Sequence, residues 1–378
     1  MTTTGRRSSG APLGTQAYPR VNGLNLVRLG LAATVVFAHA FYIVGAGIGP
    51  VIHGDNLGGW AVYGFFAVSG YLVTHSRLTR PLGDYLVHRV ARLFPGYWVC
   101  LLVMVVVVAP LGFWATNGTL SGYWSTQTQP LNYLFANSML RVSAFDIAGG
   151  PAGVPFPGVW NGSIWTLYYE FVCYLVIAAV LSVALLRRRG ALVVAGLWIV
   201  SAVLYWGWGR GVAETFGGNP ELAQLLKLLP VFLGGALLRL ARVRLHVWGV
   251  LASTVVLLLL VRVLDTGAPQ LCAPLIAYAL LWVGAVLPSP AWFRRHDISY
   301  GTYVYAFPVQ QLIVVLGLGG GVWINVGVAL LITLPLAVAS WFLVERPVMR
   351  RVRKPLPAPA AGSEPAAGSR VPPDAARL

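Results

Sequence analysis

The stretch FPGYWVCLLVMVVVVAPLGF, which covers residues 94–113, contains no charged side chain. A helix needs about 20 predominantly apolar residues to cross the hydrocarbon core of a bilayer. This stretch has that length, and its apolar residues do not alternate with polar ones as they do in a strand of a transmembrane barrel. We therefore expect residues 94–113 to form a transmembrane helix.

Nine further stretches of the chain combine similar length and apolar character. Only helices and closed barrels satisfy every backbone hydrogen bond in lipid, and none of these stretches alternates as barrel strands do. The sequence therefore predicts an all-α fold, a polytopic transmembrane helical bundle of about ten spans. Besides residues 94–113, the expected spans are 24–46, 57–76, 163–186, 190–209, 222–240, 246–264, 271–287, 298–318 and 322–344.

The overall composition excludes the other broad classes of protein. Hydrophobic residues make up 57% of the 378 residues and charged residues only 10%, whereas ordinary globular chains carry about 25% charged residues. A soluble chain of this size cannot bury so much apolar surface, and a disordered chain needs low hydrophobicity. The three cysteines lie in apolar stretches, without a CxxC pair or a nearby histidine. The sequence thus predicts neither a disulfide framework nor a metal site.

The formal net charge of +16 is explained by topology rather than by a nucleic-acid site. With the N-terminus placed inside, every inner connection is basic, and 23 of the 27 Lys and Arg residues lie on the inner side. The exceptions are Arg141, Arg210, Lys227 and Arg262. Because basic residues concentrate in cytoplasmic loops, we expect both termini to be cytoplasmic.

The remaining segments complete the expected organisation of the chain. Residues 1–23 form a cytoplasmic N-terminal segment, and residues 24–349 form the ten-helix membrane domain. Within this domain, residues 114–160 form a long outer loop rich in Gly, Pro, Asn, Ser and aromatic residues, long enough to cover a site. Residues 350–378 form a basic, Pro- and Ala-rich cytoplasmic tail that we expect to be disordered.

Two polar residues of the first expected span, Arg28 and His39, stand eleven positions apart. Eleven residues turn a helix through about 1100° and advance it about 16 Å, so both side chains lie on one face at different depths. Polar groups inside a membrane span are costly and often functional. The alternative is that Arg28 extends to the lipid headgroups and His39 bonds a neighbouring helix.

Arg89 and Arg92 lie three positions apart, on one face of a helix at the inner membrane surface. Paired guanidinium groups bind polyphosphates well. They bind anionic lipid headgroups equally well. The two arginines alone do not decide between these ligands.

The fourth expected span carries a carboxylate, Glu170, on the same helix face as Thr166. A buried carboxylate must be protonated, paired or exposed to water. Arg28, His39 and Lys227 are all candidate partners, and the sequence does not choose among them.

The ninth expected span begins with Asp297 as a candidate N-cap and carries an unusual number of polar and aromatic residues. Hydrogen bonds between helices are the structural explanation for such a stripe, and a polar site is the functional one. These residues are Ser299, Tyr300, Tyr303, Tyr305, Gln310 and Gln311.

Six short motifs, in sequential order over residues 20–350, resemble membrane acyltransferase family 3, whose bacterial members O-acylate sugars of surface polysaccharides, lipids and antibiotics. The motifs are Arg28-x10-His39, Gly64-Phe-Phe-Ala-Val-Ser-Gly70, Arg89-Val-Ala-Arg92, Ser163-Ile-Trp-Thr-Leu-Tyr-Tyr-Glu170, Ile298-Ser-Tyr-Gly-Thr-Tyr303 and Val344-Glu-Arg-Pro347. Some members carry an additional SGNH hydrolase-like domain after the bundle. Only the expected tail follows here, so the chain resembles a stand-alone member.

The resemblance implies a cytoplasmic acyl-CoA co-substrate, commonly acetyl-CoA, and a hydroxyl acceptor on or near the outer face of the bacterial inner membrane. Arg89 and Arg92 would hold the CoA phosphates, and Arg28 would lie at the mouth of a polar path. His39 would take the proton of the acceptor hydroxyl, because an imidazole pKa near neutrality suits a general base.

The resemblance implies a catalytic role for Glu170 as well, either in orienting His39 or in positioning the acceptor. Further candidate substrate-binding residues are Trp165, Tyr169, Tyr300 and Tyr303. No serine or cysteine is a convincing acyl-enzyme nucleophile, which favours direct transfer without another cofactor. The acceptor stays open among sugars, lipid-linked glycans, peptidoglycan and secondary metabolites. The rival hypothesis is a proton-coupled transporter or flippase in which His39 and Glu170 form a relay.

Overall fold

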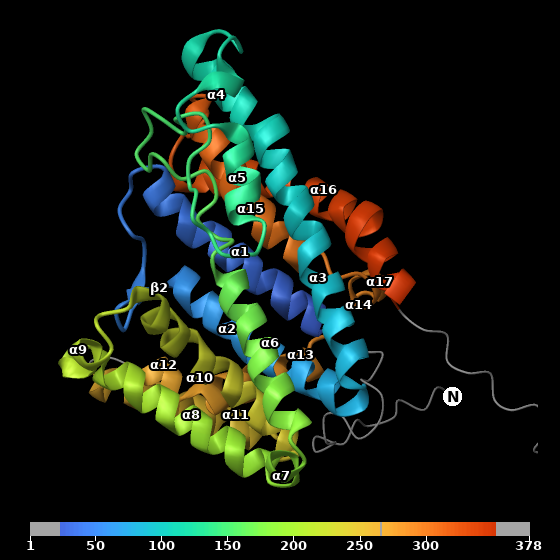
Figure 1. Cartoon of the computed structure of the whole chain (residues 1–378). Helices are drawn as coiled ribbons and strands as arrows, with labels where there is room; N and C mark the ends of the chain where they lie inside the picture. Colours follow the sequence, from blue (N-terminus) through green and yellow to red (C-terminus); the bar gives the residue numbers. More distant parts are fainter. Residues whose placement is uncertain (1–22, 265–266, 353–378) are drawn as a thin grey trace, which may run out of the picture.

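The computed structural model describes residues 23–264 and 267–352, and 75% of this part of the chain is helical (Figure 1). The expected N-terminal segment and tail fall almost wholly outside these residues. The helices are α1 (Leu24–Ile43), α2 (Leu57–Thr79), α3 (Leu82–Val103), α4 (Ala109–Asn117), α5 (Pro130–Asn137), α6 (Thr166–Ser182), α7 (Ala184–Arg188), α8 (Gly190–Gly207), α9 (Ala213–Thr215), α10 (Pro220–Leu240), α11 (Val247–Val263), α12 (Ala268–Leu271), α13 (Ala273–Val286), α14 (Ala291–Arg295), α15 (Ser299–Val315), α16 (Val322–Ser340) and α17 (Arg346–Val352).

Short irregular elements complete the secondary structure. A hairpin between α1 and α2 consists of β1 (Val51–Ile52) and β2 (Asp55–Asn56), with Val51 opposite Asn56. One 3-10 turn covers Tyr123–Ser125, and wider π-type turns interrupt three of the helices. These wider turns are Met104–Val108, Trp208–Val212 and Trp341–Glu345.

The all-α fold is confirmed, and each of the ten expected spans coincides with a helix in the described part of the chain. Six helical segments there are long and apolar enough to cross a membrane. They are Leu24–Ile43, Leu57–Thr79, Leu82–Asn117, Gly190–Gly207, Pro220–Leu240 and Val322–Val352. The other four expected spans correspond to the shorter helices α6, α11, α13 and α15. That these four helices also cross the membrane, and hence that the protein has ten spans, stays a prediction.

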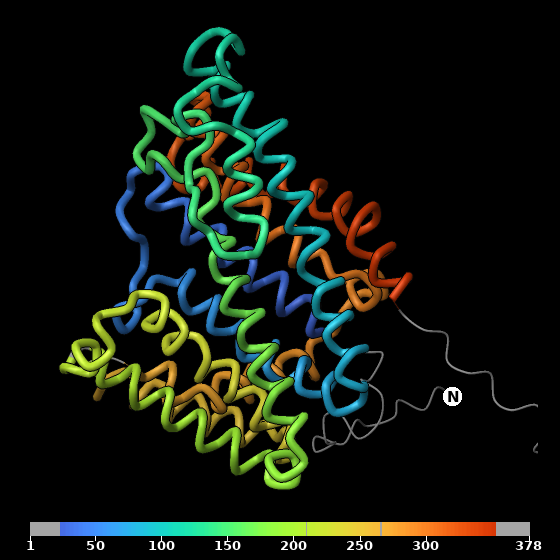
Figure 2. The backbone as a smooth tube through the Cα atoms, viewed as in Figure 1, coloured from blue at the N-terminus to red at the C-terminus, as the bar shows by residue number. Residues whose placement is uncertain are grey.

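Helices α1 and α2 lie at the centre of the bundle. Helix α1 packs against α2, α13, α15 and α16, and α2 packs most extensively against α10. Figure 2 shows α8, α10 and α11 as a layer on one side of α2, while α15 and α16 lie on the other side of α1. The two central helices therefore carry their polar residues into the interior of the protein.

The contact between α2 and α10 depends on two glycines. A Cβ atom at Gly70 would lie 1.9 Å from the carbonyl oxygen of Phe232, and one at Gly235 would lie 1.9 Å from that of Ala67. Any side chain at either position would separate the helices, because small residues are what lets two membrane helices approach closely. This close approach gives a structural reason for the glycine that ends the motif Gly64–Gly70.

The segment 114–160 packs against the bundle and contains the short helix α5. The amide nitrogen of Gln311 on α15 donates to the carbonyl oxygens of Phe156 (2.7 Å) and Val159 (2.9 Å). The amide of Gln310 donates to Val36 and Asn325 on neighbouring helices, both at 2.9 Å. Gln310 and Gln311 thus form hydrogen bonds to other parts of the chain, which is the structural explanation for the polar residues of the ninth expected span.

Candidate active site

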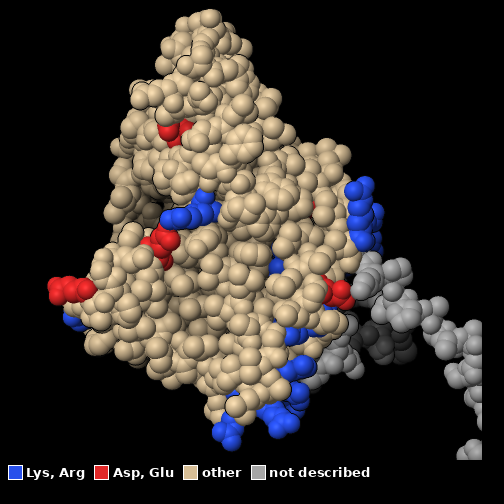
Figure 3. Space-filling model, in the orientation of Figure 1, with Lys and Arg blue, Asp and Glu red and all other residues tan. Residues whose placement is uncertain are grey.

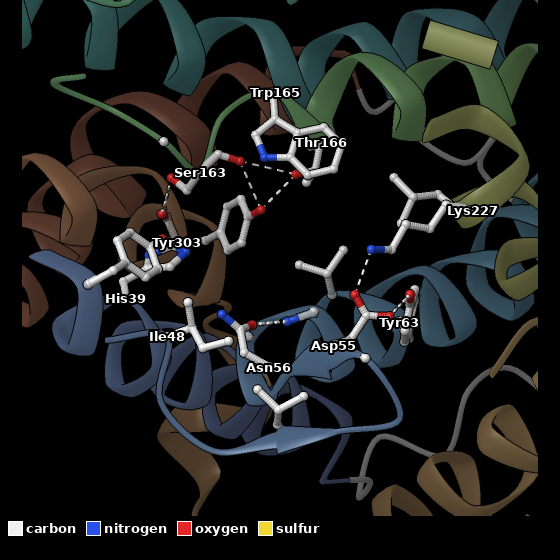
Figure 4. A pocket seen from close by; sticks show the side chains of 18 residues that line it. His39, Ile48, Asp55, Asn56, Tyr63, Ser163, Trp165, Thr166, Lys227 and Tyr303 are labelled. Atoms are coloured by element: carbon white, nitrogen blue, oxygen red, sulfur yellow. Dashed lines mark hydrogen bonds and ion pairs between the residues drawn. The ribbon is translucent and has the colours of Figure 1, made fainter. Parts of the chain in front are cut away.

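A cavity of about 360 Å³ lies beside His39 and collects residues from five helices and from the hairpin that precedes α2 (Figure 4). We call it the His39 cavity. Its polar lining includes His39 from α1, Asp55 and Asn56 from β2, Tyr63 from α2, Ser163 and Thr166 at the start of α6, Lys227 from α10 and Tyr303 from α15. Figure 4 shows His39, Ser163 and Tyr303 on one side and Asp55 and Lys227 on the other.

The imidazole of His39 is held by aromatic rings. Its centroid lies 5.0 Å from that of Phe307 and 5.6 Å from that of Tyr42, in edge-to-face arrangements. The ring makes no hydrogen bond to the described residues, and its Nδ1 atom is buried without a partner. A neutral imidazole has one donor and one acceptor nitrogen. His39 is therefore fixed in orientation by apolar contacts and free to bond a hydroxyl that enters the cavity.

Tyr303 and Thr166 form the partition on one side of the His39 cavity. The two hydroxyl oxygens lie 2.7 Å apart, and the Tyr303 hydroxyl also donates to the Ser163 carbonyl at 2.9 Å. The Ser163 hydroxyl lies within hydrogen-bonding distance of the Asn161 side-chain oxygen (2.8 Å) and of the Tyr303 carbonyl (3.1 Å). No histidine or carboxylate in the described structure contacts this serine to activate it as a nucleophile.

A second, narrow cavity of about 30 Å³ lies behind this partition, and we call it the Glu170 cavity. Thr166 and Tyr303 line both cavities. Arg28, Glu170 and Tyr300 line the Glu170 cavity and not the His39 cavity. The placement of Arg28 and His39 along one series of cavities agrees with the shared helix face that their spacing predicts.

Glu170 is hydrogen-bonded by hydroxyl groups rather than by a cation. Its Oε1 accepts from the Ser69 hydroxyl at 3.0 Å and from the Tyr174 hydroxyl at 2.6 Å. The three partners that the sequence left open are occupied elsewhere or unbonded: Arg28 pairs with Asp297, Lys227 pairs with Asp55, and His39 makes no hydrogen bond to a described residue. The carboxylate is thus positioned within the Glu170 cavity without contacting the imidazole.

Arg28, which lines the Glu170 cavity, shares the carboxylate of Asp297 with Arg92. Both contact Oδ2 of Asp297, Arg92 at 2.6 Å, and Arg92 also reaches Oε2 of Glu345 at 3.0 Å. Burial alone would raise the pKa of Asp297, but the two guanidinium groups outweigh burial and hold that pKa below its ordinary value. Asp297 also accepts from the backbone N–H of Ser299 at 3.2 Å, but the N-cap of α15 is Ile298, one residue after the expected position.

A third cavity of about 340 Å³ is rich in basic residues, and we call it the Arg89 cavity. Its polar lining consists of His75, Ser76, Thr79, Arg80, Arg89, Arg92 and Asp297. The guanidinium of Arg89 lies 5.6 Å from the ring centre of Tyr174 and 5.9 Å from that of Tyr85, and it makes no ion pair with a described residue. Arg89 is therefore available to an anion, whereas Arg92 is already neutralised by two carboxylates.

Residues 21–346, which include every residue that lines the three cavities except Met349, match the model of a family described as an acyltransferase domain. The chain belongs to this family, acyltransferase family 3. It is 27% identical to nodulation protein 10 of Rhizobium leguminosarum bv. viciae, over 87% of this chain and 93% of that protein. It is also 27% identical to an O-acetyl transferase of Shigella phage Sf6, over 87% of this chain and 96% of that protein. No solved structure matches the chain.

Membership of acyltransferase family 3 confirms the family suggested by the six motifs and makes the protein an acyltransferase. With its long apolar helices, it is a membrane enzyme. The transporter hypothesis loses its basis, because it was the alternative to this family. It also required a relay between His39 and Glu170, and Glu170 bonds Ser69 and Tyr174 instead.

The structure distributes the candidate residues of this acyltransferase among the three cavities. His39, Trp165 and Tyr303 line the first, Arg28, Glu170, Tyr300 and Tyr303 the second, and Arg89 and Arg92 the third. Tyr169 lines none of these cavities and contacts the ring of Trp165, at 5.7 Å between centroids.

The sequence did not reveal the opposite wall of the His39 cavity. Asp55 lies in a connection between expected spans, where an acidic residue is ordinary and does not indicate a site. Lys227 was a candidate only as an ion-pair partner of Glu170. The one available signal was Lys227 itself, a cation within an expected span and outside the basic inner side.

Figure 3 shows where charged side chains gather on one face of the protein. Basic residues lie mainly along its lower and right-hand margins, near α7 and α17. The opposite, upper end, formed by α4 and the segment 114–160, shows no basic cluster on this face. This asymmetry is consistent with the orientation that the positive-inside rule predicts.

Proposed function

We propose that the protein is an integral-membrane O-acyltransferase of the bacterial inner membrane. It moves an acyl group, in our proposal acetyl, from cytoplasmic acyl-CoA to a hydroxyl of a sugar-containing acceptor at or near the outer face. The observation that carries this proposal is the set of three cavities. The Arg89 cavity holds a guanidinium without an ion pair to a described residue, and the Glu170 and His39 cavities share Thr166 and Tyr303 and lead to an imidazole without a hydrogen bond to a described residue.

The donor binds at the Arg89 cavity in this proposal. CoA carries several phosphate groups, and charge-assisted hydrogen bonds from a guanidinium to phosphate are among the strongest in proteins. Arg89 supplies such a guanidinium without losing an ion pair to any residue that the structure describes. The thioester end of the donor then extends past Glu170 toward His39, which requires the Tyr303–Thr166 hydrogen bond to open.

His39 acts as the general base in the transfer step. It takes the proton of the acceptor hydroxyl as the oxygen attacks the thioester carbonyl carbon. The new C–O bond forms, the C–S bond breaks, and the CoA thiolate leaves and takes up the proton. Glu170 lies one cavity away and contributes to positioning through the helix that also carries Thr166.

The proposed reaction is tested with membranes from cells that contain or lack the protein. With labelled acetyl-CoA, wild-type membranes should release CoA and transfer the label to an extracted envelope or secreted glycan. Mass spectrometry of glycans from the deletion strain should show loss of acetyl groups that the plasmid-borne gene restores. An unchanged glycan profile in the deletion strain, together with no CoA release, would contradict the proposal.

The proposed sidedness is tested by thiol labelling. We expect a cysteine at the exposed Ser121 to react with an impermeant reagent added to intact cells, and a cysteine at the exposed Arg188 not to react. The background must lack Cys100, Cys173 and Cys272, which are all buried. Labelling of both positions in permeabilised cells is the control. Reaction at position 188 alone in intact cells would reverse the orientation and exclude a cytoplasmic donor site at Arg89.

A further inference from the structure

An ion pair closes the side of the His39 cavity that faces away from His39 (Figure 4). Nζ of Lys227 on α10 lies 2.6 Å from Oδ1 of Asp55 on β2. The Tyr63 hydroxyl donates to the other oxygen of Asp55, also at 2.6 Å. The side chains of Lys227 and Asp55 keep 25% and 20% of their surface exposed. The pair is thus fixed in place by two elements and still accessible from the cavity.

This side of the cavity has unused hydrogen-bonding capacity. A lysine ammonium has three N–H donors and a carboxylate has about four acceptor positions, and the pair uses one donor and two acceptors within the described structure. The neighbouring Asn56 accepts from the Gly59 N–H at 3.0 Å through its side-chain oxygen. Its amide nitrogen has no partner among the described residues, and Figure 4 shows it on the cavity side.

The charges in this cavity cancel. Lys227 and Asp55 are the only formally charged side chains in its lining, as far as the structure describes it. An anionic ligand would therefore meet a carboxylate beside the one cation, and a cationic ligand would meet an ammonium. Paired donors and acceptors at fixed positions suit an uncharged ligand with several hydroxyl groups, and Trp165 adds an aromatic surface to the same cavity.

We propose that Asp55, Asn56 and Lys227 are the specificity-determining residues for the acceptor, and that the acceptor unit is an uncharged sugar ring. Its hydroxyls bond to these three residues, while one further hydroxyl lies at His39 on the other side of the cavity. This inference rests on the proposed function. To the proposed function it adds two points: which residues select the acceptor, and that the selected sugar is uncharged.

The test measures the kinetics of acetyl transfer to glycan extracted from the deletion strain, using full-length protein in nanodiscs. For Lys227→Met, we expect the KM for glycan to rise about ten- to a hundredfold, because a hydrogen bond to a charged group is lost. The KM for acetyl-CoA should not change, and kcat at saturating glycan should change little. A merely structural ion pair would instead lower kcat and affect both substrates.

Two further variants keep the test decisive if Lys227→Met folds poorly. Asp55→Asn keeps the shape and leaves Lys227 without its counter-charge, so it should also raise the KM for glycan. Glu214→Gln removes an exposed acid outside the cavity and is the matched control, with no change expected. Fragment mass spectra of the product should place the acetyl group on an uncharged sugar.

The outcomes separate this inference from the proposed function. If the wild-type protein transfers acetyl groups and both cavity variants keep its KM for glycan, the inference is wrong and the function stands. Acetylation of a uronic acid or of a phosphate-bearing sugar would overturn the proposed selection of an uncharged unit. If the wild-type protein transfers nothing from acetyl-CoA to the glycan, the proposed function is wrong and the inference falls with it.

Discussion

Replacing His39 with glutamine should lower the rate of acyl transfer by about 10²–10⁴-fold, the usual contribution of a positioned general base. Glutamine keeps hydrogen-bonding capacity at this position but cannot take up a proton near neutral pH. The affinity for CoA should not change, because the donor phosphates bind in the Arg89 cavity, which His39 does not line. Turnover of labelled acetyl-CoA and equilibrium binding of CoA measure the two effects separately.

The packing of His39 allows the effect of His39→Gln on turnover to be interpreted as a loss of basicity. The imidazole makes no hydrogen bond to a described residue and is held by the rings of Tyr42 and Phe307, so its loss leaves no polar partner unsatisfied. His246 is exposed at the start of α11, and His246→Gln is the matched control, with unchanged turnover expected. Turnover of His39→Gln within a few-fold of wild type would exclude the general-base role and direct attention to Glu170.

The helices could be predicted because each one is encoded by its own stretch of sequence. Residues 94–113 are apolar without interruption, and they fall within the continuous helical segment Leu82–Asn117. The shared face of Arg28 and His39 follows from helical geometry alone and agrees with their positions in neighbouring cavities. Helix α5 was harder to predict, because a short amphipathic stretch between Gly- and Pro-rich residues gives little periodic signal.

The partners of the polar residues could not be predicted, because they come from helices distant in sequence. Arg92 was expected to bind phosphate, yet its two carboxylates lie 205 and 253 positions further along the chain. No local spacing encodes such pairs. The Glu170–Tyr174 hydrogen bond is different, since residues four apart on a helix are neighbours, and sequence reasoning could have found it.

Replacing Arg92 with alanine should destabilise the folded protein by about 3–5 kcal/mol, the usual effect of removing one partner from a buried ion pair. Glu345 is only 1% exposed and would lose its cation, while Asp297 would keep Arg28 alone. Thermal unfolding in detergent, followed by loss of the monodisperse protein, measures the change.

Arg89→Ala is the matched control for Arg92→Ala, because Arg89 stacks on Tyr85 and Tyr174 and has no ion pair among the described residues. It should fold normally and lose affinity for CoA instead. The double variant Arg92→Ala/Glu345→Gln should regain part of the lost stability, because it no longer buries an uncompensated carboxylate. Equal stability of the wild type and Arg92→Ala, with CoA affinity lost in the variant, would show that Arg92 is mainly a phosphate ligand. The two carboxylates would then restrain a side chain that binds the donor, and the division of roles between Arg89 and Arg92 would be wrong.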